Sequence, residues 1–173
     1  MSVANAELEP WLRGTLTEVD AVSRAVLHAL ELAEEDVAKW CGGLSDEEMN
    51  ARPFGVAPVA FHLRHIARSL DRLLSYAEGT QLDATQKAAL KTELDSGATR
   101  EGVMAEFAAA MRTSAARVRA FAPEQLNVAR GVGRAALPTT VGGLLVHCAD
   151  HTQRHVGQAV TTAKVVAAMR DLA

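Results

Sequence analysis

Three histidines recur at four-residue steps near the C-terminal end of the sequence: His147, His151 and His155. The stretch around them lacks proline, and we expect it to form a long helix. Because each residue turns an α-helix by about 100°, side chains four residues apart lie one above the other on one face. His151 and His155 could therefore offer two imidazoles to one metal ion, whereas His147 lies a further step round the helix.

Two further histidines, His62 and His65, lie in a second stretch with helical periodicity, residues 59–77. They interrupt an otherwise apolar stripe, and a local pattern that is broken in this way often marks a functional position. The charged residues of the same stretch are expected to form a solvated face: Arg64, Arg68, Asp71 and Arg72.

If the two histidine-bearing faces meet, His65, His151 and His155 form a three-histidine cluster. Three protein ligands and one open position are typical of a catalytic zinc site. Three neutral imidazoles also suit nickel, iron or cobalt, so the metal is not specified. The alternative is that the histidines are ordinary polar residues of the core, hydrogen-bonded to neighbours and without a metal.

Four long amphipathic stretches must bury their apolar faces against one another, which predicts an all-α four-helix bundle with short additional helices. The first long helix is expected to begin at a capping box formed by Thr15 and Glu18 and to end at two glycines. A shorter helix is expected over 83–94, and 123–138 reads as an irregular connection. The long helices are expected over 16–41, 59–77, 100–121 and about 138–169.

The composition limits the possible classes of function. The chain has 173 residues, expected to form a single domain, with a net charge of −3 and no cluster of Lys or Arg, so nucleic acid is not an expected partner. No apolar run has the length of a membrane span, and the first residues lack a secretory signal, so we expect a cytoplasmic protein. Two cysteines, Cys41 and Cys148, do not form a disulfide framework, and their thiols are expected to be reduced and unreactive.

The sequence resembles the DinB-like (YfiT-like) superfamily of bacterial four-helix-bundle metalloproteins over nearly its whole length. The most specific parts are the segment 65–74, which begins His-Ile-Ala-Arg, and the segment 151–158, His-Thr-Gln-Arg-His-Val-Gly-Gln. The resemblance implies that His65, His151 and His155 bind a divalent metal, beside a pocket open to solvent, in a protein that forms homodimers. The family motif usually has paired histidines before the glycine, whereas Arg154 precedes His155 here.

The resemblance also suggests an activity, because the superfamily includes metal-dependent transferases that use low-molecular-weight thiols. We therefore expect an enzyme that activates a thiol toward a small electrophile, with a metal-dependent hydrolase or a non-enzymatic metal- or ligand-binding stress protein as alternatives. His62 or His147 could shuttle a proton, bind substrate or supply a fourth ligand. Gln158 could orient a ligand histidine, and Arg134 could receive a carboxylate.

Overall fold

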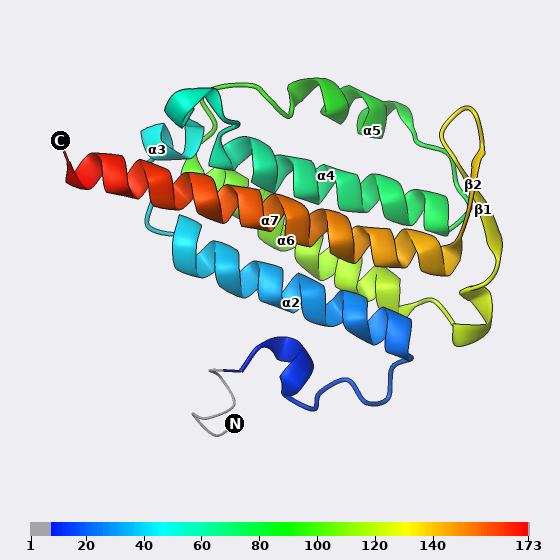
Figure 1. The fold of residues 1–173 in the computed structure, drawn as a ribbon. Helices are drawn as coiled ribbons and strands as arrows, with labels where there is room; N and C mark the ends of the chain where they lie inside the picture. The colour runs from blue at the N-terminus through cyan, green and yellow to red at the C-terminus, as the bar shows by residue number, and fades with distance from the viewer. Residues whose placement is uncertain (1–7, 173) are drawn as a thin grey trace.

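A computed structural model describes residues 8–172, and its framework is a bundle of four long helices (Figure 1). These are α2 (Ala21–Cys41), α4 (Val59–Ala77), α6 (Arg100–Arg119) and α7 (Val141–Asp171). The longest helix, α7, packs against both α2 and α4, while α6 packs against the other side of the same two helices. The all-α four-helix bundle expected from the apolar periodicity is confirmed.

The interior of the bundle is made by aliphatic side chains that recur every three or four residues on each long helix. Burial of this apolar surface is the main force that holds the helices together. The most completely buried members include Val26, Leu30, Val37, Leu63, Ile66, Leu70, Leu74, Met111, Leu145 and Val156. Within residues 8–172, no helix is both long enough and apolar enough to cross a membrane.

Short elements connect the long helices. Helix α3 (Asp46–Asn50) and the 3-10 turn η2 (Pro53–Gly55) lie between α2 and α4. Helix α5 (Ala84–Ala89) and the 3-10 turn η3 (Leu90–Thr92) follow α4, so the regular helix expected over 83–94 is shorter than predicted. Two further 3-10 turns are η1 (Pro10–Leu12) and η4 (Pro123–Gln125).

The start of the first long helix and the connection 123–138 differ from the sequence interpretation. The first long helix begins at Ala21 and not at Leu16, because Leu16 has a left-handed φ of 58° and the carboxylate of Asp20 accepts the backbone N–H groups at the helix start. The connection 123–138 is not wholly irregular. It contains strand β1 (Ala129–Val132), which pairs antiparallel with β2 (Leu137–Thr140).

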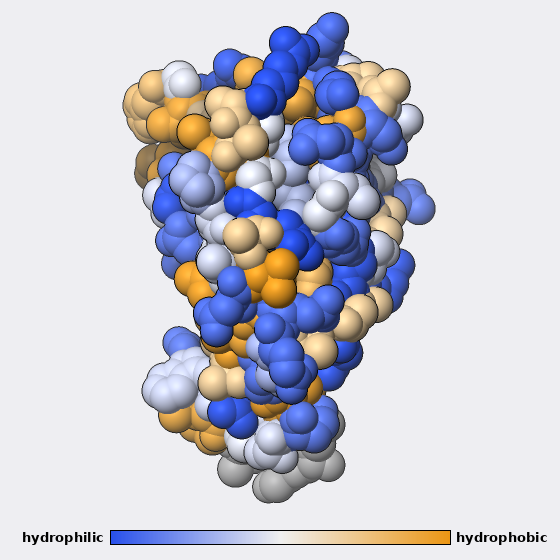
Figure 2. Space-filling view, turned by 90° about the vertical axis from the view of Figure 1, so that its right-hand side faces the viewer, coloured by the Kyte–Doolittle hydropathy of each residue, from blue (hydrophilic) through white to orange (hydrophobic). Residues whose placement is uncertain are grey.

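The hairpin projects at the end of the bundle where α7 begins (Figure 1). Seen toward this end, the surface mixes hydrophilic residues with scattered apolar groups and has no continuous apolar face (Figure 2). Arg134, considered above as a carboxylate receptor, is exposed in the turn of this hairpin.

Candidate metal centre

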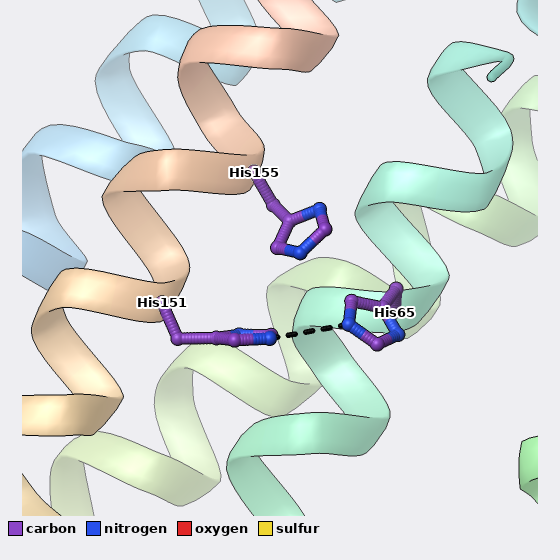
Figure 3. A group of neighbouring side chains, drawn as sticks. All are labelled: His65, His151 and His155. Atoms are coloured by element: carbon purple, nitrogen blue, oxygen red, sulfur yellow. Dashed lines mark hydrogen bonds between the residues drawn. The ribbon is translucent and has the colours of Figure 1, made fainter.

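The three histidines singled out by their spacing converge in the gap between α4 and α7 (Figure 3). His65 comes from α4, and His151 and His155 come from successive turns of α7. One ring nitrogen of each lies within 4.8 Å of the corresponding nitrogens of the other two. The Nε2 atoms of His65 and His151 are 3.1 Å apart, and the ring of His155 is centred 4.5 Å from that of His65.

The cluster lies at the edge of the core and not within it. Its neighbours on α7, Thr152 and Val156, are buried, and so is Ile66 beside His65 on α4. The three histidines themselves are half-buried. The helical period therefore turns apolar side chains inward and sets the imidazoles one step away, where a small molecule could still approach them.

A buried carboxylate orients the His65 ring. Glu93, at the end of the η3 turn, is 6% exposed, and its Oε2 lies 2.7 Å from His65 Nδ1. A carboxylate accepts hydrogen bonds, so Nδ1 carries the proton and the Nε2 lone pair faces the cluster. The other oxygen of Glu93 accepts from the guanidinium of Arg72 at 2.9 Å, and Arg72 also donates to Ser69.

The interpretation of Arg72 as part of a solvated face was wrong, because Arg72 is 9% exposed. His65, Ser69 and Arg72 lie at i, i+4 and i+7, on one side of α4, and the guanidinium needs an opposite charge there. Sequence reasoning missed Glu93 altogether. The only signal that pointed to it was this arginine on the histidine-bearing side of the helix.

His62 supports the cluster from its other side. Its Nδ1 lies 3.1 Å from Nδ1 of His155, and the residue is 5% exposed. His155 therefore has its Nδ1 engaged with His62, which leaves Nε2 as the nitrogen that faces the cluster (Figure 3). By contrast, the side chain of His147 is 47% exposed, lies 3.8 Å from the carboxylate of Asp150, and does not belong to the convergent group.

Burial is the main cause, and neighbouring imidazoles a smaller one, of a lowered pKa in three of these histidines. The pKa of His62, His151 and His155 falls from 6.5 to about 4, so these rings are neutral near pH 7. A neutral imidazole has a free lone pair, which is the form that binds metals.

The arrangement fits a divalent metal ion. A tetrahedral ion with bonds of about 2.05 Å holds its ligand nitrogens roughly 3.3 Å apart, close to the spacing found between His65 and His151. The ring held by Glu93 also has the hydrogen bond that metal-binding histidines normally make through their second nitrogen. Neutral imidazoles suit zinc, nickel, iron and cobalt alike, so the cluster could hold a divalent ion without specifying which.

A pocket of about 610 Å³ adjoins the cluster on the His62 side. It lies between the loop that follows η2 and the middle of α7, and its walls include His62, Arg154 and Gln158, but not the three convergent histidines. Gln158, considered above as a residue that orients a ligand histidine, makes no hydrogen bond to a histidine within residues 8–172. It belongs to the pocket wall instead.

The metal-free protein should lose stability as the pH falls from about 6.5 toward 4. Over this range the unfolded chain takes up protons on histidines whose pKa is 6.5, while His62, His151 and His155 in the folded protein, with pKa values of about 4, do not. The unfolded state then binds more protons, so the free energy of unfolding decreases with decreasing pH. Urea unfolding of chelator-treated protein at several pH values would measure this slope.

A double variant in which His151 and His155 are both replaced by Gln is the control for the pH experiment. It keeps the carboxylates that also titrate in acid and removes two of the histidines whose pKa is lowered. Its stability should depend less steeply on pH between 6.5 and 4. An unchanged slope would contradict the assignment of neutral, desolvated imidazoles.

Comparison with known proteins finds a family match that spans most of the bundle. The model of the DinB superfamily matches residues 29–159, which include His65, His151 and His155. A search among curated proteins finds no match. Because the family match covers well over half of the sequence and the structure has the helical architecture expected of it, this chain belongs to the DinB superfamily.

Proposed function

We propose that the protein binds a divalent metal ion through His65, His151 and His155 and catalyses the reaction of a low-molecular-weight thiol with a small electrophile. The observation that supports the proposal is the convergence of three half-buried imidazole nitrogens within 4.8 Å. Three protein ligands leave a tetrahedral ion with one position for an exogenous molecule. A fourth histidine that closed the site would favour a storage or carrier role, but His62 directs Nδ1 to His155 and His147 lies outside the group.

A divalent ion, when bound, supplies Lewis acidity that lowers the pKa of a thiol or of water. The chain's own residues fix the direction of the ligand nitrogens. Glu93 holds the His65 proton on Nδ1, and His62 engages Nδ1 of His155, so that both rings present Nε2. Such preorganisation avoids a reorientation of the rings during the reaction.

The protein's own thiols are poor candidates for the nucleophile. Cys41 and Cys148 are both fully buried, and burial raises the pKa of these thiols to about 11 and about 12. Thiolates are therefore scarce near neutral pH at either position. A thiol reaction in this protein needs an external cosubstrate, which agrees with the transferase activity that the family resemblance implies.

Each of the three histidines should be required for tight metal binding. We expect tag-free protein to bind one zinc or nickel ion per chain, and replacement of His65, His151 or His155 by Ala to weaken binding by more than about 100-fold, beyond the usual effect of an outer hydrogen-bond partner. Competition with a chromophoric chelator measures the affinity. The matched control is His147→Ala on the same helix, whose affinity should stay unchanged. Equal losses for His147 and His151 would contradict the proposed ligand set.

Glu93 should set the metal affinity through His65. Glu93→Gln removes the negative charge that holds the Nδ1 proton and faces Arg72, so we expect metal binding to weaken by about 10–100-fold. Glu106→Gln is the matched control, because Glu106 of α6 pairs at 2.7 Å with Arg68, which lies on α4 like Arg72, but does not touch a histidine. If both variants bind zinc as tightly as the unaltered protein, Glu93 has no orienting role.

Turnover is the test of the reaction type. Metal-loaded protein should accelerate the reaction of 1-chloro-2,4-dinitrobenzene with at least one of cysteine, glutathione, bacillithiol and mycothiol, and the acceleration should disappear in His65→Ala. Absorbance of the thioether product measures the rate. No acceleration with any of these thiols, in protein whose metal content has been confirmed, would count against the transferase. Hydrolysis of ester or amide substrates by the same preparation would favour the hydrolase instead.

A further inference from the structure

The pocket beside the metal centre has the dimensions and lining of a small-molecule site. Its volume of about 610 Å³ lies within the usual range of roughly 300–1,000 Å³ for ligand pockets. One wall is the apolar loop from Pro53 to Ala57, and the opposite wall is α7 from Arg154 to Val165. His62 lines the side toward the cluster, so only one imidazole ring separates the pocket from His155.

Gly157 in the α7 wall is a poor residue for the helix but leaves room in the pocket. It lies in the interior of a 31-residue helix, where glycine is the least favourable residue apart from proline. A Cβ at this position would meet no atom within 4 Å, so no packing contact requires glycine. The space that a side chain would occupy belongs to the pocket.

Phe54 in the opposite wall is also unfavourable for the isolated protein. It has a left-handed φ of 53°, a conformation that bulky residues rarely adopt, and it is 90% exposed. An exposed aromatic ring on strained backbone gains little from burial in the free protein. Strain of this kind persists mainly at binding sites. Phe54 and Gly157 thus have one property in common: each lines the pocket and each is locally unfavourable for the stability of the fold.

The imidazole and the guanidinium of the pocket lining are hydrogen-bond donors, beside one amide and two hydroxyl groups that can donate or accept. If His155 binds the metal through Nε2, its Nδ1 carries a proton and donates to Nδ1 of His62. The proton of His62 is then on Nε2, which has no hydrogen-bond partner among the described residues. Arg154 adds a guanidinium that uses one nitrogen for Asp150, at 2.6 Å, and keeps its other donors. Donors at one end and a mostly apolar lining elsewhere suit an apolar molecule with an anionic end.

We propose that this pocket binds the electrophilic substrate by its apolar body and that the substrate is a small carboxylic acid, whose carboxylate accepts hydrogen bonds from His62 and Arg154. The inference rests on the proposed metal centre, because metal ligation by His155 determines which nitrogen of His62 donates. The apolar part of the acid packs between Phe54 and the open face of Gly157. The bound acid therefore contacts His62, whose ring separates it from the proposed ligand His155, and it does not displace a metal ligand.

The experiment uses 4-phenylbutanoate as the probe and its neutral analogue 4-phenylbutanamide as the comparison. Isothermal titration of the zinc-loaded protein should show binding of the acid, and binding of the amide should be at least about tenfold weaker, since the amide cannot form a charge-assisted pair. Arg154→Gln should remove most of this preference by weakening binding of the acid alone. Zinc content is measured in the same samples.

Two variants test the opposed effects on stability and binding. Gly157→Ala should raise the melting temperature by about 2–4 °C, as expected for alanine in place of a helical glycine. It should also weaken binding of 4-phenylbutanoate by roughly tenfold. Phe54→Gly should leave the melting temperature unchanged or raise it, because glycine tolerates the left-handed φ. It should also weaken binding of 4-phenylbutanoate. Ala168→Leu, an exposed position on the same helix outside the pocket, is the matched control and should leave binding unchanged.

The outcomes separate this inference from the proposed function. If zinc binds and neither probe does, or if acid and amide bind equally, the pocket assignment is overturned while the metal centre stands. If Gly157→Ala binds the acid as well as the unaltered protein, the probe does not occupy this pocket. If zinc does not bind at all, the proposed function is wrong, and so is the assignment of Nε2 of His62 as a hydrogen-bond donor, because that assignment depends on metal binding by His155.

Discussion

Four imidazole rings share the gap between α4 and α7, and each neutral ring has only one proton for its two nitrogens. Glu93 accepts a hydrogen bond from Nδ1–H of His65, so Nε2 of His65 can only accept. Nε2 of His151 lies 3.1 Å away, and His155 is engaged on its outer side by His62. Lone pairs brought together in this way repel unless a proton or a cation lies between them. The surrounding structure can be understood as the means of keeping these nitrogens in place.

The connection between α4 and α6 contributes to this positioning through Glu93. It places the charged side chain of Glu93 in the interior, which is unfavourable unless the charge is compensated. Arg72 provides the compensation from α4 itself, one turn beyond Ser69. An apolar pair of similar size would cost less, so stability alone does not account for the arrangement. The pair is best explained by the one contact that an apolar pair could not make, which is the hydrogen bond to His65.

The sequence was informative wherever one helix determined the geometry. The four-residue spacing of His151 and His155 requires both rings on one face of any helix, and the apolar stripe around His65 requires that this residue lie near the core. The convergence of the two helices followed from the need to bury both stripes. Features made by contacts between distant segments were missed. Glu93 belongs to a segment with weak periodicity, and Arg72 was interpreted from its charge alone.

Local signals also failed where a stronger competing contact was present. Thr15 and Glu18 have the spacing of a capping box, but Thr15 Oγ1 lies 3.1 Å from Nε2 of the buried His28, and Asp20 caps the helix. The hairpin was missed because its strands have four residues each and contain glycine or proline, which disfavour strands when judged by composition. At the helix start the contact with His28 replaced the expected cap, and in the hairpin backbone pairing outweighed a strand propensity of about 1 kcal/mol or less.

The two sides of the cluster differ in a way that bears on how it can work. His65 is backed by a buried carboxylate and a buried guanidinium, both about nine-tenths buried or more, so its orientation is insulated from solvent. His155 is backed by His62, whose ring also forms part of a pocket wall. A molecule in the pocket can therefore change the hydrogen bonding of His62 and, through the 3.1 Å contact, that of His155. In the proposed metal centre, His65 is therefore held by buried groups while His155 contacts a ring in the pocket wall, and this asymmetry couples occupation of the pocket to the electron density that His155 can donate.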